Sequence, residues 1–273
     1  MSPTTIALLI VLGLAVGLFG TLVGAGGGFI LTPILLLVYP EDSPSTITAI
    51  SLVVVFFNAL SGSAAYARQR RIDYRAGVAF AVATFPGAVA GALLVAVAPR
   101  RLFDALMAAL LAGMAAWLIA GTRQRAGRAS RPAGQPRELT DRDGIIYHYA
   151  VPMVRGVAFS LLVGFVSSFL GIGGGVLHVP LLIGALGFPV HVATATSHFV
   201  LANMAAVGTV THILAGNFSG GTGLRRAAAL SIGVVMGAQV GALLSRRVHG
   251  VVIQRLLAAA LVAIAARLLV SVL

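Results

Sequence analysis

The chain has 273 residues, of which 59% are hydrophobic and only 10% are charged, and its mean hydropathy is +1.00. A soluble domain carries about 25% charged residues, so this composition excludes one and indicates an integral membrane protein. The chain has no cysteine, which excludes disulfides and thiolate metal sites, and no aromatic residue interleaves with the arginines of 123–142, which argues against a nucleic-acid binder despite the net charge of +12.

Ten apolar segments are expected along the chain. In the first half they cover 4–23, 29–39, 46–66, 77–98 and 102–121, and in the second half 151–171, 176–187, 192–215, 227–245 and 250–273. A membrane-spanning helix needs about 20 residues, which four segments in each half provide. The segments 29–39 and 176–187 are too short and contain Pro33 and Pro180, so we expect half-helices or re-entrant arms there.

The predicted fold is an all-α polytopic membrane protein with 8–10 membrane segments in two homologous halves. The halves are 1–121 and 151–273, and the stretch 122–150 is interpreted as a basic cytoplasmic linker because it is rich in Arg, Pro, Gly and Ser. The first apolar segment lacks a basic start and a small-residue cleavage site, so a retained span is favoured over a signal peptide.

The two halves share a glycine motif. Residues 17–33 overlay 164–180 at one constant offset, so that Gly-Ala-Gly-Gly-Gly-Phe at 24–29 corresponds to Gly-Ile-Gly-Gly-Gly-Val at 171–176. Farther along, residues 86–94 overlay 236–244 with six of nine positions identical. Helix-breaking segments at matching places in two halves are the best sequence indication of a transporter binding site.

The orientation of the halves stays open. Arginine bias predicts that 67–76 and 122–150 are cytoplasmic. Five spans per half would give inverted repeats, whereas re-entrant short segments would give four spans per half and parallel repeats. The loops 216–226 and 246–249 would decide between these, but each contains two arginines.

The glycine motifs are candidate anion sites. Successive amide N–H groups without side chains, at the positive end of a helix dipole, can bind an anion. The competing interpretation is close helix packing, and two copies, each before a short proline-containing segment, favour substrate contact. The candidate residues are Gly24, Gly26, Gly27, Gly28, Gly171, Gly173, Gly174 and Gly175.

Polar side chains on the third segment of each half are the second set of substrate-binding candidates. Hydroxyl and amide groups can replace the hydration shell of an oxyanion, although Ser and Thr in membrane helices also bond to their own backbone. The candidates are Thr48, Ser51, Asn58, Thr194, Thr196, Ser197, His198 and Asn203.

The ionisable residues indicate the charge of the substrate. All seven acidic residues lie in loops or near segment ends, so a negative or neutral substrate fits better than a cation. His198 and His178 are the candidates for proton coupling, against the alternative that each only packs. Neither a metal site nor a cofactor is expected, since no HxxxH pair is present.

The paired Gly-x-Gly-Gly-Gly-(Phe/Val)-x-x-x-Pro motifs, the duplication and the basic central loop resemble the TauE/SafE sulfite exporter family, also called the toluene sulfonate uptake permease family. The resemblance covers nearly the whole chain. It implies a multi-pass protein of the bacterial cytoplasmic membrane that moves sulfite, sulfoacetate or other organosulfur anions. His178 and His198 lie outside the glycine motifs, so the resemblance implies no role for them.

The sequence therefore predicts a secondary carrier of small sulfur-containing anions, not an enzyme. An anion channel on the same scaffold is the alternative, followed by a membrane-embedded enzyme. The expected partners are the small anion and the lipid bilayer, without nucleic acid. The exact substrate, the direction of transport, the coupling ion and the oligomeric state, a homo-oligomer included, stay open.

Overall fold

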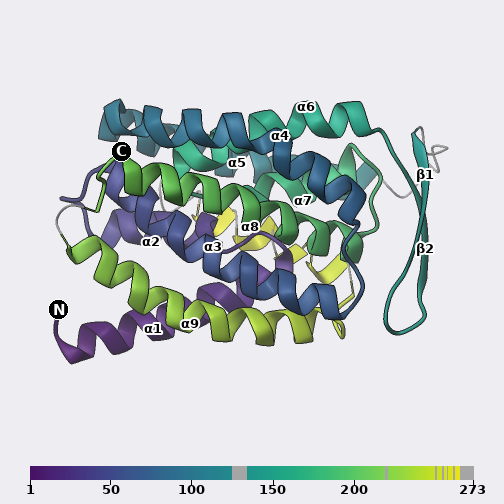
Figure 1. The fold of residues 1–273 in the computed structure, drawn as a ribbon, viewed down its shortest axis with the longest axis horizontal. Coiled ribbons are helices and arrows are strands. Elements are labelled where there is room, and N and C mark those ends of the chain that lie inside the picture. The colour runs from purple at the N-terminus through teal and green to yellow at the C-terminus, as the bar shows by residue number, and fades with distance from the viewer. Residues whose placement is uncertain are drawn as a thin grey trace.

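The computed structural model describes residues 1–124, 134–218 and 221–249, and the stretch 251–264 without residues 254, 257 and 261. These residues form a bundle of α-helices with one two-stranded β-hairpin at its end (Figure 1). Within them, six helices are long and apolar enough to cross a membrane. These are α1 Pro3–Val23, α3 Pro44–Arg68, α4 Tyr74–Leu94, α6 Met153–Leu170, α8 Val190–Leu214 and α9 Thr222–Ser245.

The short segments of the two halves are short helices. They are α2 Gly28–Val38 and α7 Gly175–Gly184, each with its proline inside the helix. The 25-residue α5 Arg100–Gln124, the 3-10 turn η1 Val95–Val97 and a short apolar helical stretch over Val251–Ile264 complete the described helical part. The predicted all-α polytopic membrane fold is confirmed.

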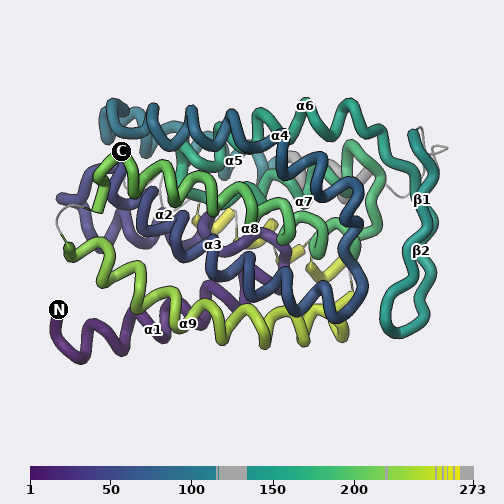
Figure 2. The backbone as a smooth tube through the Cα atoms, viewed as in Figure 1, coloured from purple at the N-terminus to yellow at the C-terminus, as the bar shows by residue number. Residues whose placement is uncertain are grey.

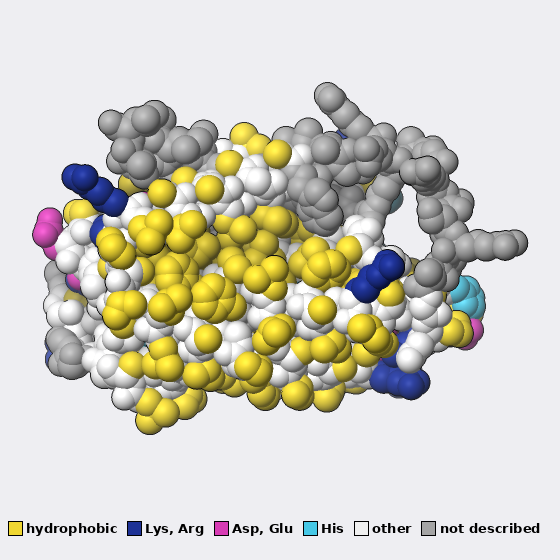
Figure 3. All heavy atoms as spheres, turned by 90° about the horizontal axis from the view of Figure 1, so that it is seen from above, with side chains coloured by type: hydrophobic (Ala, Val, Ile, Leu, Met, Phe, Trp, Pro, Cys, Tyr) yellow, Lys and Arg dark blue, Asp and Glu magenta, His cyan; other side chains and the backbone are white. Residues whose placement is uncertain are grey.

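The helices lie side by side along the long axis of the molecule (Figures 1 and 2). α1 packs along α9 on one side of the bundle, α4 packs along α6 on the other, and α3 and α8 lie between them in mutual contact. Apolar side chains cover the middle of the face in Figure 3, whereas arginine and acidic side chains gather toward its two ends. This distribution fits helices that cross a hydrocarbon layer and end at its polar boundaries.

Glycines allow the outer helix pairs to approach at backbone distance. A Cβ atom at Gly17 of α1 would overlap the carbonyl oxygen of Val234 in α9, and one at Gly164 of α6 would overlap that of Thr84 in α4. Under the offsets of the sequence repeat, these two contacts are the same contact in the two halves. The packing thus supports the predicted internal repeat, in which α1 of the first half packs on α9 of the second, and α6 of the second half packs on α4 of the first.

Corresponding helices of the two halves run in opposite directions. Along α3 and α8, Gly62 lies against His198 and Gly208 lies against Leu52, which is an antiparallel arrangement. α9, which corresponds to α4, runs from the end of the bundle where α3 begins toward the hairpin. Arg226 at its start pairs with Asp42 before α3, whereas Arg246 after its end pairs with Asp143 in the hairpin. Helices that correspond under the sequence repeat are therefore arranged in opposite senses, which the arginine count alone did not decide.

The stretch interpreted as a linker contains a β-hairpin. Strand β1 Gln135–Thr140 pairs antiparallel with β2 Ile146–Val151 and lies at one end of the bundle, which we call the hairpin end (Figure 2). Asp141 accepts hydrogen bonds from the amides of Asp143 and Ile145 in the turn, and Gly144 supplies a positive φ of 82°. Residues 125–133 of the expected linker lie outside the described residues.

Candidate functional site

Two tight turns interrupt the helices at the glycine motifs. We call residues 24–28 the first glycine turn, which joins α1 to α2, and residues 171–175 the second, which joins α6 to α7. Each turn contains three residues in left-handed backbone conformations that only glycine adopts without strain. Their φ angles are 80°, 77° and 78° at Gly24, Gly26 and Gly27, and 66°, 67° and 31° at Gly171, Gly173 and Gly174.

The two glycine turns contact each other in the middle of the bundle. Gly26 packs against Leu201 and Gly173 against Val55, and both partners lie near the middle of 25-residue helices. A Cβ atom at Gly28 would lie 2.7 Å from the carbonyl oxygen of Ile172, which real side chains do not tolerate. The glycines of these motifs therefore serve two purposes: they form the turns, and they let the backbones of the two turns approach closely.

Each short helix begins with amide groups that have no acceptor. Among the described residues, no hydrogen bond forms from the amides of Gly27, Gly28 and Phe29 in the first half, or from those of Gly173, Gly174 and Val176 in the second. Ser167, a buried residue, adds a hydroxyl without a partner 3.3 Å from the Cβ position of Gly174. Free donors at the positive end of a helix dipole can bind an anion, so the two turns stay candidates for the predicted anion site.

Hydroxyls from each half cap the glycine turn of the other half. Ser51 of α3 donates to the carbonyl oxygen of Gly171 at 2.6 Å, and Ser197 of α8 donates to that of Gly24 at 3.3 Å. Thr48 and Thr194 also lie against Gly171 and Gly24, respectively. The structure thus brings these four predicted residues to the two turns, although the hydroxyl of Thr194 bonds to Val190 in its own helix.

His198 and Asn58 belong to one buried polar cluster beside the first glycine turn. Thr21 of α1 donates to Oδ1 of Asn58 at 2.8 Å, and Nε2 of His198 lies 3.3 Å from the Thr21 hydroxyl. The Tyr66 ring meets the His198 ring edge-on at 5.4 Å between centroids. Thr21 and Tyr66 were not predicted, since one threonine on a helix and one tyrosine near a segment end carry no signal alone.

The remaining candidates have structural partners. The Thr196 hydroxyl accepts the amide of Asp73 before α4, and Asn203 donates to Phe199 in its own helix. His178 lies 3.0 Å from the Ser160 hydroxyl of α6 and packs against Phe80 of α4. The structure therefore does not place His178 in the cluster of His198.

Charged residues concentrate at the hairpin end. Arg71 pairs with the buried Asp141 at 2.9 Å and ties the hairpin to the end of α3. Burial alone would raise the pKa of the Asp141 carboxyl, but the Ile145 amide and the Arg71 guanidinium together hold this pKa below its usual value. Burial raises the pKa of Tyr149, whose hydroxyl donates to Asp73 at 3.0 Å.

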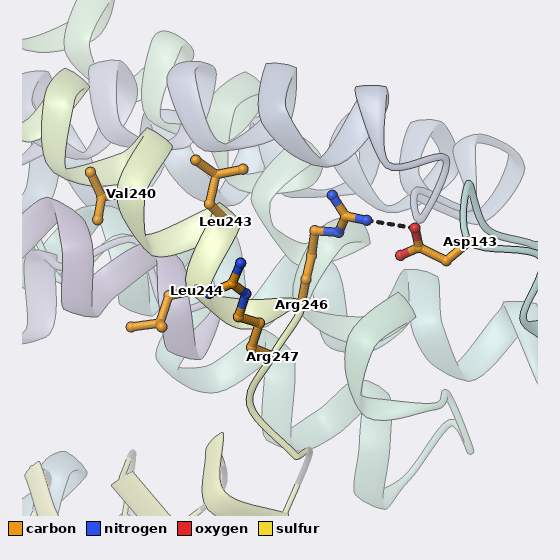
Figure 4. A pocket seen from close by; sticks show the side chains of 6 residues that line it. All are labelled: Asp143, Val240, Leu243, Leu244, Arg246 and Arg247. Carbon is orange, nitrogen blue, oxygen red and sulfur yellow. Dashed lines mark hydrogen bonds and ion pairs between the residues drawn. The ribbon is translucent and has the colours of Figure 1, made fainter.

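A pocket of about 550 Å³ also lies at the hairpin end. Arg246 reaches from the end of α9 across to Asp143 of the hairpin, and apolar side chains of α9 line the other side (Figure 4). The full lining is Asp143, Val240, Leu243, Leu244, Arg246 and Arg247. None of these residues belongs to the glycine turns, so this pocket is separate from the candidate anion site.

Comparison with known proteins agrees with this geometry. Residues 9–268 match the family described as sulfite exporter TauE/SafE. The chain belongs to this family. It is 30% identical over 253 residues to the probable membrane transporter protein YunE of Bacillus subtilis, covering 89% of each chain.

The family includes more distant relatives in other organisms. The chain is 30% identical over 207 residues to a probable membrane transporter protein of Xylella fastidiosa, covering 76% of this chain and 70% of the relative. It is 26% identical over 212 residues to one of Methanocaldococcus jannaschii, covering 76% and 72%. No solved structure matches the chain. The protein is therefore a multi-pass membrane transporter of the cell membrane.

Proposed function

We propose that this member of the TauE/SafE family is a secondary carrier of small sulfur-containing oxyanions such as sulfite or organosulfonates. One observation carries the proposal, namely that two helix N-termini with free amides meet near the centre of inverted halves. The family description names sulfite, and the donors suit an oxyanion because amides and hydroxyls can replace its hydration shell.

The inverted arrangement supports alternating access. In inverted-repeat transporters the substrate site lies where the repeats meet, and rocking of one part against the other exposes it to either side. The glycine turns are packed together here, with Gly28 at backbone contact distance from Ile172 and Gly175 at the same contact with Ala25. An anion would enter only after the turns separate, which favours a carrier over an open channel.

The one serine–histidine contact in the described membrane helices argues against an enzyme. The Ser160 hydroxyl donates to the carbonyl oxygen of Gly156 at 2.7 Å. Its single proton is thus engaged within α6 and is not shared with Nε2 of His178, 3.0 Å away. Both side chains are buried, with 0% and 3% exposure, respectively.

Counterflow in proteoliposomes tests the proposal. We expect radiolabelled sulfite or a labelled sulfonate to accumulate faster in vesicles preloaded with unlabelled substrate than in empty vesicles. Flux without this trans-stimulation would identify a channel, and absence of any flux across a panel of sulfur oxyanions would refute the proposed substrate class. Protein-free vesicles provide the background.

The arginine-rich hairpin end is expected to face the cytoplasm, which accessibility of Arg142 to trypsin in oriented vesicles would check.

A further inference from the structure

Three buried oxygen atoms form a triangle at the end of α6. The Thr32 hydroxyl of α2 lies 2.8 Å from both the Ser51 hydroxyl of α3 and the carbonyl oxygen of Gly171, and Ser51 lies 2.6 Å from the same carbonyl. Thr32 and Ser51 are both 0% exposed. Three helices thus place oxygen atoms around one point.

The hydrogen atoms available do not satisfy this triangle. Two hydroxyls supply two protons for three oxygen–oxygen contacts, so one contact brings two lone pairs together. Thr48, one helical turn before Ser51, lies against Gly171, and its buried hydroxyl has no hydrogen-bond partner among the described residues. The Gly171 carbonyl follows the last residue of α6, at the negative end of the helix dipole.

We propose that these oxygens, from Thr32, Thr48, Ser51 and Gly171, bind a sodium ion that couples to anion transport. Backbone carbonyls at broken helix ends are known ligands of coupling ions in transporters. The ligands are neutral, and α2, α3 and α6 contain no Asp or Glu, so the site does not supply the carboxylates that hold Ca²⁺ or Mg²⁺. The coupling part rests on the proposed function, whereas ion binding does not.

The second half lacks the equivalent triangle. The residue that corresponds to Thr32 there is Val179, which has no hydroxyl, and Ser197 bonds to the Gly24 carbonyl at the longer distance of 3.3 Å. The hydroxyl of Thr194, the mate of Thr48, is occupied by the carbonyl of Val190. Within the described residues, the proposal therefore places a sodium site at the second glycine turn and none at the first.

The position of the site provides the coupling. The Gly171 carbonyl lies within the same turn as the free amides of Gly173 and Gly174, where we place the anion. A cation at one end of this turn and an anion at the other attract each other across a short, dry distance. Bound sodium therefore raises anion affinity, and by linkage the anion raises sodium affinity by the same factor.

Thermal unfolding of the purified protein tests ion binding without transport. We expect the melting temperature to rise with sodium chloride and to saturate, but not with potassium or choline chloride at the same ionic strength. In Thr32→Val the sodium concentration for half of this rise should increase at least about tenfold. Valine fits this place, because Val179 occupies it in the second half, and Thr211→Val, which loses only a bond within α8, is the matched control.

An absent sodium-specific shift in the wild type, or a full shift in Thr32→Val, would overturn the site. Counterflow then separates the two proposals. Anion flux that is equal in sodium and choline would refute the coupling while the carrier stands. A sodium shift that depends on Thr32, in a protein without any anion flux, would support the ion site and refute the proposed substrate class.

Discussion

Gly28→Ala isolates the contact between the two glycine turns. Gly28 begins α2 in a helical conformation, so alanine adds no strain of left-handed backbone. Its Cβ atom would lie 2.7 Å from the carbonyl carbon and oxygen of Ile172 and 2.7 Å from Val55. Because Ile172 presents backbone atoms there, the second glycine turn must move to accommodate one methyl group.

The magnitude follows from two opposing effects. Overpacking of a tight interior costs about 1–3 kcal/mol, and the helix preference of alanine over glycine returns about 0.5–1 kcal/mol. We therefore expect Gly28→Ala to lower the free energy of unfolding by up to about 2.5 kcal/mol. Counterflow should fall at least about tenfold, since the displaced turns lie where we propose that the anion binds.

Gly113→Ala is the control for this substitution. Gly113 lies exposed in α5, and an added Cβ would have no atom within 4 Å. We expect the same melting temperature or a slightly higher one, and unchanged counterflow. Both variants should insert equally well, as measured by extraction from membranes. If Gly28→Ala behaved as Gly113→Ala does in both assays, the contact between the turns would have no role in transport.

Three further predictions follow from the same geometry. Gly27→Val and Gly174→Val should insert but abolish counterflow, because β-branched residues do not adopt their positive φ; unchanged counterflow in both would contradict the anion site. Asp141→Asn should speed amide exchange of the hairpin at neutral pH. In the wild type, exchange should accelerate only below about pH 3.8, the usual pKa of an aspartate. The folded-state pKa of Asp141 is lower than this, so its carboxylate stabilises the hairpin above that pH, and the stabilisation is lost as the pH falls through the folded-state pKa. His198→Gln should flatten a decrease in sulfonate affinity with rising pH; a profile that is already flat or survives unaltered leaves His198 a packing residue.

The centre of the site could be predicted from the sequence because helix interruption is a local property. Successive glycines before a short proline-containing helix break the hydrogen-bond ladder wherever they occur, and their repetition identified two such breaks. The hydroxyls predicted on the segment after each break include Thr48 and Ser51 in the first half and Thr194 and Ser197 in the second, and all four lie at the turns.

Other features depend on how helices rotate and where they end in space. Thr32 was missed because nothing in a short apolar helix shows that its hydroxyl faces the carbonyl of a residue 139 positions away. His178 and His198 are both buried histidines of the second half, but their helices present them to different neighbours, Ser160 and Thr21. Equal arginine counts in two loops left the inversion undecided, since charge bias requires a difference.

The hairpin was missed for a different reason. Residues 135–151 contain no continuous apolar run, and the alternating pattern of a strand does not resemble the long apolar run of a membrane span. Its pairing is fixed by the turn at Asp141 and its position by the pair with Arg71. The ion pair is buried, so it becomes evident only when both partners are placed in space.

The differences between the two halves define what the transporter does beyond its scaffold. Two identical inverted halves would present the same site to both sides of the membrane and would favour neither direction. The first half has Thr32 where the second half has Val179, so the proposed cation ligands lie at the second glycine turn. The second half has His198 where the first half has Leu52, and each packs on the matching glycine, Gly62 or Gly208. The titratable group therefore lies beside the first glycine turn. The sodium and pH dependences should thus be separable, with Thr32→Val removing only the first and His198→Gln only the second. A variant that lost both together would show that the turns act as one unit rather than as two specialised ends.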